Sequence, residues 1–120
     1  MYVAIVSSDK ARAERLGERI LDTCLSNGCY STFMNFTADH GFLDELDKRE
    51  FSTVVLTADG AKELMLAKSI SDKKPNVKLI LLGSDKAAVE GYSVNAHYCA
   101  DAEPAHEDIC RIADIIFPVA

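Results

Sequence analysis

Short apolar runs rich in β-branched residues recur along this chain, and they limit its fold more than any other feature. Three of them are continuous enough to be strands that are covered on both faces: YVAIV at 2–6, STVVLT at 52–57 and VKLILL at 77–82. The segments between them place apolar residues at helical spacing, as 10–26 does. Such an alternation indicates a parallel sheet with helices on both of its faces.

The same patterns, followed through all 120 residues, predict five strand–helix units in a single domain, 1–120. The expected strands cover 2–6, 30–36, 52–57, 77–82 and 95–100, and the expected helices cover 10–26, 39–49, 60–71, 85–92 and 105–117. A five-stranded α/β sheet of order 2-1-3-4-5, the flavodoxin-like arrangement, fits this length better than a larger dinucleotide-binding domain.

The net charge of −6 argues against two classes of partner. A protein that binds nucleic acids or anionic membrane surfaces needs a basic face, and this sequence has no basic stripe. No apolar run is long enough to span a membrane, and the N-terminus lacks the pattern of a signal peptide. We therefore expect a cytoplasmic protein that contacts neither nucleic acid nor membrane through this domain.

Four cysteines, Cys24, Cys29, Cys99 and Cys110, would be thiols in that compartment. None belongs to a C-x-x-C pair, so a structural zinc site has little support. Cys24 and Cys110 fall on the first and last expected helices, which share one face of a 2-1-3-4-5 sheet. Buried thiols are the simpler interpretation, and a redox switch is the alternative.

Polar residues follow the expected strands at the points where these end. They are Ser7–Asp9, Thr57–Asp59, Gly83–Ser84 and Cys99–Asp101. In open α/β sheets, ligands bind beyond the carboxyl ends of the strands. Any functional site is therefore expected among these residues.

The chain resembles the receiver domain of bacterial response regulators, with its CheY-like fold, over essentially its whole length. The stretch AAVEGYSVNA at 87–96 resembles the run from the fourth helix into the fifth strand in the LytTR class of these regulators. YVAIVSSD and FSTVVLT fall where the family has its first and third strands. The resemblance implies a part in two-component signal transduction, or phosphorelay, and in transcription regulation.

The chemistry of that family is phosphoryl transfer onto an aspartate, and it needs four kinds of group. An acidic pair after the first strand holds Mg²⁺, which prefers anionic oxygen ligands. An aspartate at the end of the third strand is the nucleophile. A Ser or Thr after the fourth strand and a Lys after the fifth bind the phosphoryl group and balance its charge.

None of these groups is present where the resemblance puts it. The acidic pair maps to Ser7 and Ser8, and the nucleophile maps to Thr57. Neutral hydroxyls bind Mg²⁺ far more weakly than carboxylates do. Thr57 is not acidic and has no evident base beside it.

The two remaining positions are altered as well. The Ser/Thr position maps to Gly83, although Ser84 is adjacent, and the Lys maps to Ala102 or Glu103. The sequence therefore predicts a pseudo-receiver that has lost its phosphorylation site. We expect no enzymatic activity, no cofactor and no bound Mg²⁺.

Two other functions remain open on the residues. One is a phospho-accepting receiver whose acceptor has moved to Asp59, with Asp9 or Asp101 supplying metal ligands. The other is a small-ligand or flavin-binding module, in which the hydroxyls after the first strand hold a phosphate and Tyr98 stacks on a ring.

A dense tract of metal-ligand side chains lies near the fifth strand: His97, Cys99, Asp101, Glu103 and His106. Alternation along a strand would send the first three of these to one side. A transition-metal site is conceivable there. Strand interior followed by a polar loop and a helix start is the more common arrangement for such a tract.

The resemblance also implies a surface for a protein partner or a homodimer. In the family this surface is formed by helix 4, strand 5 and helix 5. The residues that fall on it here are Val89, Tyr92, His97, Ile109 and Arg111. With no phosphoryl switch, partner binding would set the conformational state of the domain.

Overall fold

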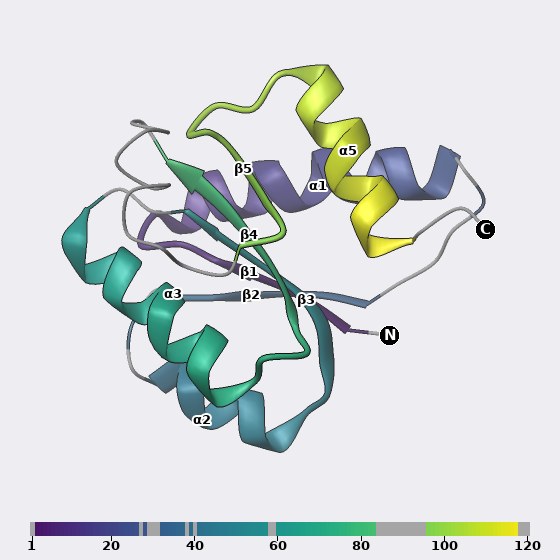
Figure 1. The fold of residues 1–120 in the computed structure, drawn as a ribbon. Coiled ribbons are helices and arrows are strands. Elements are labelled where there is room, and N and C mark those ends of the chain that lie inside the picture. The colour runs from purple at the N-terminus through teal and green to yellow at the C-terminus, as the bar shows by residue number, and fades with distance from the viewer. Residues whose placement is uncertain are drawn as a thin grey trace.

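The computed structural model describes residues 2–26, 28, 32–37, 39, 41–57, 60–83 and 96–117. Its strands form one parallel sheet of order β2-β1-β3-β4-β5, which confirms the predicted α/β fold (Figure 1). The strands are β1 (Tyr2–Val6), β2 (Thr32–Phe36), β3 (Phe51–Thr57), β4 (Lys78–Gly83) and β5 (Tyr98–Asp101). The helices are α1 (Lys10–Ser26), α2 (Gly41–Lys48), α3 (Ala61–Lys73) and α5 (His106–Ile116). The helix expected over 85–92 lies outside the described residues.

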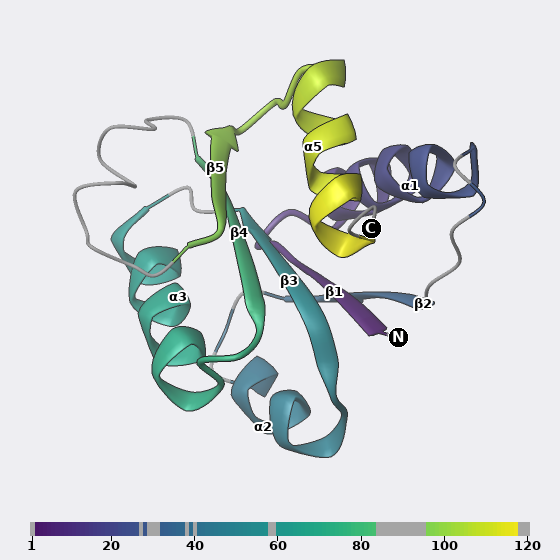
Figure 2. The same cartoon turned by 45° about the vertical axis from the view of Figure 1, so that its right-hand side comes forward.

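The sheet separates two apolar cores. α1 and α5 cover one face, and α2 and α3 cover the other (Figures 1 and 2). Successive strand residues point to opposite faces, so Val3 and Ile5 of β1 join the α1–α5 core while Ala4 and Val6 join the α2–α3 core. Covering both faces explains why the strands read as continuous apolar runs rather than as alternating ones.

The order of the strands decides which of them are fully buried. β3 and β4 lie inside the sheet, and Val54, Val55, Ile80 and Leu81 are all 0% exposed. β2 is an edge strand, and none of its residues is fully buried. The most apolar sequence runs are therefore those that the topology places in the middle of the sheet.

Two of the boundaries that differ from the sequence prediction lie beside local hydrogen bonds. α2 begins at Gly41 rather than at 39, because the Asp39 carboxylate accepts the Gly41 N–H at 2.9 Å and holds the chain in a turn. β5 begins at Tyr98 rather than at 95. Just before it, His97 donates its backbone N–H to the Leu79 carbonyl at 2.7 Å and accepts the Leu79 N–H on its ring Nδ1 at 3.3 Å. Among the described helices, none has the length and apolarity that a membrane span requires.

Candidate functional site

Strand register brings Ser7 and Thr57 together at the carboxyl end of the sheet. Val6 of β1 is paired with Leu56 of β3, so the residues that follow them are neighbours. The Thr57 hydroxyl donates a hydrogen bond to Ser7 Oγ at 2.7 Å. Thr57 is 0% exposed and Ser7 is 2% exposed. Two neutral hydroxyls, hydrogen-bonded to each other below the surface, thus fill the place predicted for the acidic site.

Ser7 is held by further hydrogen bonds on both sides. Its backbone N–H donates to the Phe36 carbonyl at 3.0 Å, which extends the pairing of β1 and β2 by one residue. Its Oγ also accepts the backbone N–H of Asp9 at 3.1 Å and fixes the turn that leads into α1. The Ser7 hydroxyl therefore has a structural task, because it joins two strands to the following helix.

The carboxylate of Asp9 is engaged at the start of α1. Its Oδ1 accepts the backbone N–H of Arg12 at 3.2 Å, as an N-cap does. Ser8, between the two, is exposed. Mg²⁺ requires several oxygen ligands, preferably anionic, that converge on one point. The hydroxyls of Ser7 and Thr57, both buried and bonded to each other, do not fit that ion.

The described ends of β4 and β5 supply one carboxylate, that of Asp101. Gly83 ends β4 without a side chain, and it is paired with Asp101 at the end of β5. Asp101 is exposed. Ser84 and Asp59 lie outside the described residues, so the alternative of a displaced acceptor at Asp59 stays a prediction.

A guanidinium reaches the loop after β5, and the sequence prediction missed it. Arg12 of α1 donates from Nη2 to the carbonyl oxygen of Ala102 at 3.0 Å. Ala102 is one of the two positions at which the resemblance puts a lysine. The two residues are 90 positions apart in the sequence, so only the topology, with α1 beside the carboxyl end of β5, could have indicated the contact.

The side chains of the tract near β5 are separated rather than gathered. His97 binds the backbone of β4, and the ring Nε2 of His106 lies 3.6 Å from Cys110 Sγ on the next turn of α5. Within the described ranges, no group of three or more His, Cys, Asp or Glu side chains is placed to hold a metal ion. The strand and the helix carry the members of this tract apart, so the geometry of the described residues gives the transition-metal alternative no support.

The cysteines on the first and last helices lie in different environments. Cys24 is buried in the core between α1, α5 and the sheet. Cys110 is half-buried beside His106. A redox link between them stays a prediction, and Cys29 lies outside the described residues.

The predicted partner surface is corrected at one position. Ile109 is 1% exposed and belongs to the α1–α5 core, so its side chain is not available to a partner. His97 and Arg111 are exposed, and Arg111 Nη2 lies 3.9 Å from Glu107 Oε1. Val89 and Tyr92 lie outside the described residues, as does nearly all of the stretch 87–96.

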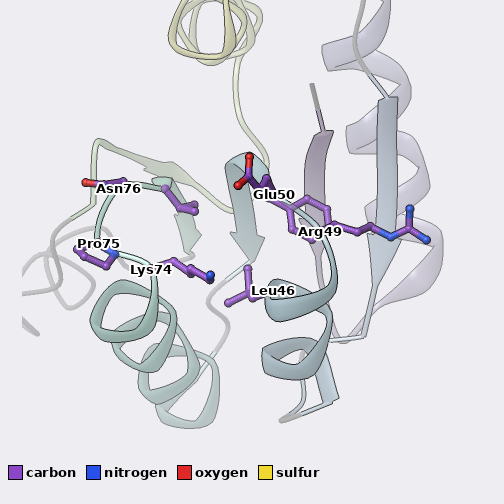
Figure 3. A pocket seen from close by; sticks show the side chains of 8 residues that line it. Leu46, Arg49, Glu50, Lys74, Pro75 and Asn76 are labelled. Atoms are coloured by element: carbon purple, nitrogen blue, oxygen red, sulfur yellow. The ribbon is translucent and has the colours of Figure 1, made fainter.

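A cavity of about 280 Å³ lies at the opposite end of the sheet (Figure 3). The end of α2, the start of β3 and the segment before β4 line it. In Figure 3 the Lys74 amine points toward Leu46, whereas the Arg49 guanidinium points away from both of these residues. That guanidinium lies 5.8 Å from the centre of the Tyr2 ring. The cavity therefore combines an apolar floor with one amine and the Glu50 carboxylate, and it is remote from the strand-end hydroxyls.

A second cavity, about 230 Å³, adjoins those hydroxyls. Its lining includes Ser7, Ser8, Lys10, Asn35 and Thr37. The Asp9 carboxylate already caps the helix beside it, where a phosphate would otherwise bind. Tyr98, the residue expected to stack on a flavin, instead donates its hydroxyl to Asp108 Oδ1 at 2.5 Å.

Tyr98 and Asp108 join β5 to the start of α5. The other carboxylate oxygen of Asp108 accepts the backbone N–H of Ala105 at 3.2 Å, so this carboxylate serves both elements. Burial of the phenol, and next the hydrogen bond to Asp108, raise the pKa of Tyr98 to about 12.

We expect Tyr98→Phe to lower the free energy of unfolding by about 1–2 kcal/mol at neutral pH. The folded-state pKa is raised above the ordinary value of 10.0, so the stabilisation is complete below pH 10 and is lost as the pH rises through about 12. Denaturant unfolding of both proteins across that range measures the difference. Tyr2→Phe, which removes a phenol hydroxyl at the start of β1 on the opposite face of the sheet, is the matched control for the substitution itself. A Tyr98→Phe difference that is constant up to pH 12 would contradict the assignment.

Comparison with known proteins identifies the fold of the chain but no family to which its sequence belongs. No family model matches the chain, and no curated protein matches it. Among solved structures, the response regulatory domain of protein mrkE from Klebsiella pneumoniae is 18% identical, with a TM-score of 0.73 and coverage of 97% of this chain and 94% of that one. The BeF3-activated receiver domain of DrrB, a Thermotoga maritima regulator, is 19% identical, with a TM-score of 0.68 and coverage of 95% of each chain.

An orphan response regulator of H. pylori, HP1043, is also similar in structure. It is 15% identical, with a TM-score of 0.63, and the match covers 97% of this chain and 96% of that chain. Identities this low establish the fold alone. The chain therefore has the five-stranded α/β fold that response-regulator receiver domains share.

Proposed function

We propose that this chain is a pseudo-receiver, which keeps the receiver fold without the phosphorylation chemistry and acts by binding other proteins. The observation that carries the proposal is the hydrogen bond of 2.7 Å between the buried hydroxyls of Thr57 and Ser7. An acyl phosphate can form only on a carboxylate, and any phosphoryl acceptor must be reachable by the phosphate donor. The Thr57 hydroxyl is neutral and 0% exposed, so it fits neither an acyl-phosphate mechanism nor modification by a protein kinase in this state.

Loss of the phosphoryl switch changes how such a domain would signal. A receiver acts through the populations of two conformations, and a ligand shifts them only by binding one better than the other. Here a protein partner, or a second copy of the chain, would take the place of the phosphoryl group. The partner surface that we propose contains the exposed His97 and Arg111. Val89 and Tyr92 join it on the resemblance alone.

The chemistry of the chain favours a cytoplasmic protein partner over other partners. The net charge of −6 disfavours DNA and anionic membranes. The resemblance of 87–96 to the LytTR class supports a part in transcription regulation, in which any DNA contact would be made by another domain.

A titration of the amide NMR spectrum with Mg²⁺ and then beryllofluoride tests the proposal, with an active receiver domain titrated in parallel. We expect no saturable shift at millimolar Mg²⁺ and none when beryllofluoride is added, because the hydroxyl pair supplies no anionic ligand. Saturable shifts centred on 57–59 that disappear in Asp59→Asn would overturn the pseudo-receiver and support the displaced acceptor.

A further inference from the structure

Three arginines of α1 line a cavity between that helix and the segment that joins β5 to α5. The cavity has a volume of about 230 Å³. Its lining consists of Arg12, Arg15, Leu16 and Arg19 from α1, and Ala102, Glu103 and Pro104 from the joining segment. None of these residues lines the cavity beside Ser7 or the one in Figure 3. The arginine cavity is therefore a separate feature of the fold.

The three guanidiniums come from one face of the helix. Residues three and four apart on a helix are neighbours, so Arg15 stands between Arg12 and Arg19. The outer two are separated by seven residues, which is about 10 Å along the axis. Leu16, at 6% exposed, supplies an apolar floor beside them. The positive charges thus follow a short line along one side of the cavity.

Backbone carbonyls hold the two outer arginines in place. Arg12 Nη2 donates to the Ala102 carbonyl at 3.0 Å, and Arg19 Nη1 donates to the Pro104 carbonyl at 3.0 Å. A guanidinium has five N–H donors in a rigid planar fork, so the one bond from Arg19 leaves donors for a ligand. Side chains that are already positioned lose less entropy when a ligand binds.

Arg15 has no partner of its own in the described part of the chain. No hydrogen bond or ion pair joins it to any residue there, and its side chain is exposed. Among the described residues that line the cavity, Glu103 has the only carboxylate, beside the three arginines. This local excess stands out in a protein whose net charge is −6.

From this arrangement we propose that the cavity binds a phosphate-type oxyanion, either inorganic phosphate or the phosphate of a small monoester. Guanidinium forks match phosphate oxygens in pairs, which makes arginine the usual residue for such groups. The volume is below the range of about 300–1,000 Å³ that is usual for drug-sized ligands, so the cavity suits a phosphate group better than a flavin or a dinucleotide. Arg15 would be the main ligand, with Arg19 beside it.

Amide NMR titration of the whole chain with inorganic phosphate, at constant ionic strength and pH, tests this proposal. We expect saturable shifts of the amides of residues 12–19 and 102–103. Arg15→Gln should weaken binding at least about ten-fold, because it removes a charged donor pair. Glu103→Gln should tighten binding a few-fold by removing the competing carboxylate. Arg49→Gln, which makes the same charge change at the opposite end of the sheet, should leave the affinity unchanged.

A parallel titration with adenosine 5′-monophosphate distinguishes the two sources of the phosphate. Tighter binding than inorganic phosphate, with additional shifts, would identify a monoester, whereas equal binding would identify the free ion. Shifts that do not saturate, or affinities that are the same in the wild type and in Arg15→Gln, would overturn the proposal. The shifts would appear away from 57–59, so this result and the test of the pseudo-receiver can fail independently.

Discussion

Thr57→Asp is expected to lower the free energy of unfolding by about 3–5 kcal/mol at neutral pH, the cost of an uncompensated buried charge. The new carboxylate would occupy a position that is 0% exposed, next to Ser7 Oγ. The resemblance to receiver domains puts an aspartate at this position, so the substitution introduces the nucleophile of that family into a site that is neutral here. Urea unfolding followed by circular dichroism measures the loss.

The effect of pH on Thr57→Asp gives an independent check. Burial raises the folded-state pKa of a carboxyl group above its unfolded value. The protonated acid is tolerated, so the penalty should shrink as the pH falls and grow as the pH rises. Thr57→Val is the matched control: it removes the hydrogen bond without adding charge, and we expect a loss of about 1 kcal/mol that does not depend on pH.

One result would contradict this reading of the strand ends. Suppose that Thr57→Asp were as stable as the wild type at neutral pH and that Mg²⁺ stabilised it further. The new carboxylate would then be binding Mg²⁺ together with ligands that are already present. The acidic residues beyond Thr57 would then still form part of a working centre.

Ile109→Ala is expected to cost about 2–5 kcal/mol of stability, the usual price of truncating a large buried side chain. Ile109 is 1% exposed and packs in the core shared by α1, α5 and the sheet. The loss should appear as a shift of the denaturation midpoint. Self-association, measured as the apparent molecular mass at several protein concentrations, should not change.

Arg111→Ala on the same helix is the control for Ile109→Ala. Arg111 is exposed, and its nearest carboxylate oxygen is 3.9 Å away, so we expect a change in stability of less than about 1 kcal/mol. A cost below about 1 kcal/mol for Ile109→Ala, together with loss of self-association, would return Ile109 to the partner surface.

The sequence predicted the fold because its strongest signals are those that burial imposes. The apolar runs of β1, β3 and β4 are buried on both faces, so each reads as a strand with no tertiary information. The ends of weaker elements depend on single side chains. Asp39 delays the start of α2, and His97 precedes the short strand β5 with contacts to Leu79. Periodicity carries no information about such contacts.

The location of the candidate site could be predicted from the sequence, but the hydrogen bonds within it could not. Topology alone places Ser7 and Thr57 at neighbouring strand ends. Packing decides which of the two hydroxyls donates the hydrogen bond, and packing also buries both of them. The contact of Arg12 with Ala102 joins residues 90 positions apart, and no local pattern marks it. The misplacement of Ile109 was avoidable, because its spacing with Ile112, Ala113 and Ile116 is that of a core-facing helix stripe.

An assay of phosphoryl transfer is the most direct test of whether this chain is a pseudo-receiver. Purified protein would be incubated with acetyl phosphate and Mg²⁺, and its intact mass would be measured beside that of an active receiver domain treated in the same way. The pseudo-receiver account predicts an unchanged mass for this chain while the active domain gains a phosphoryl group. A phosphorylated species that forms in the wild type and is absent in Asp59→Asn would contradict the account, and would mean that the acceptor has moved by two residues from Thr57.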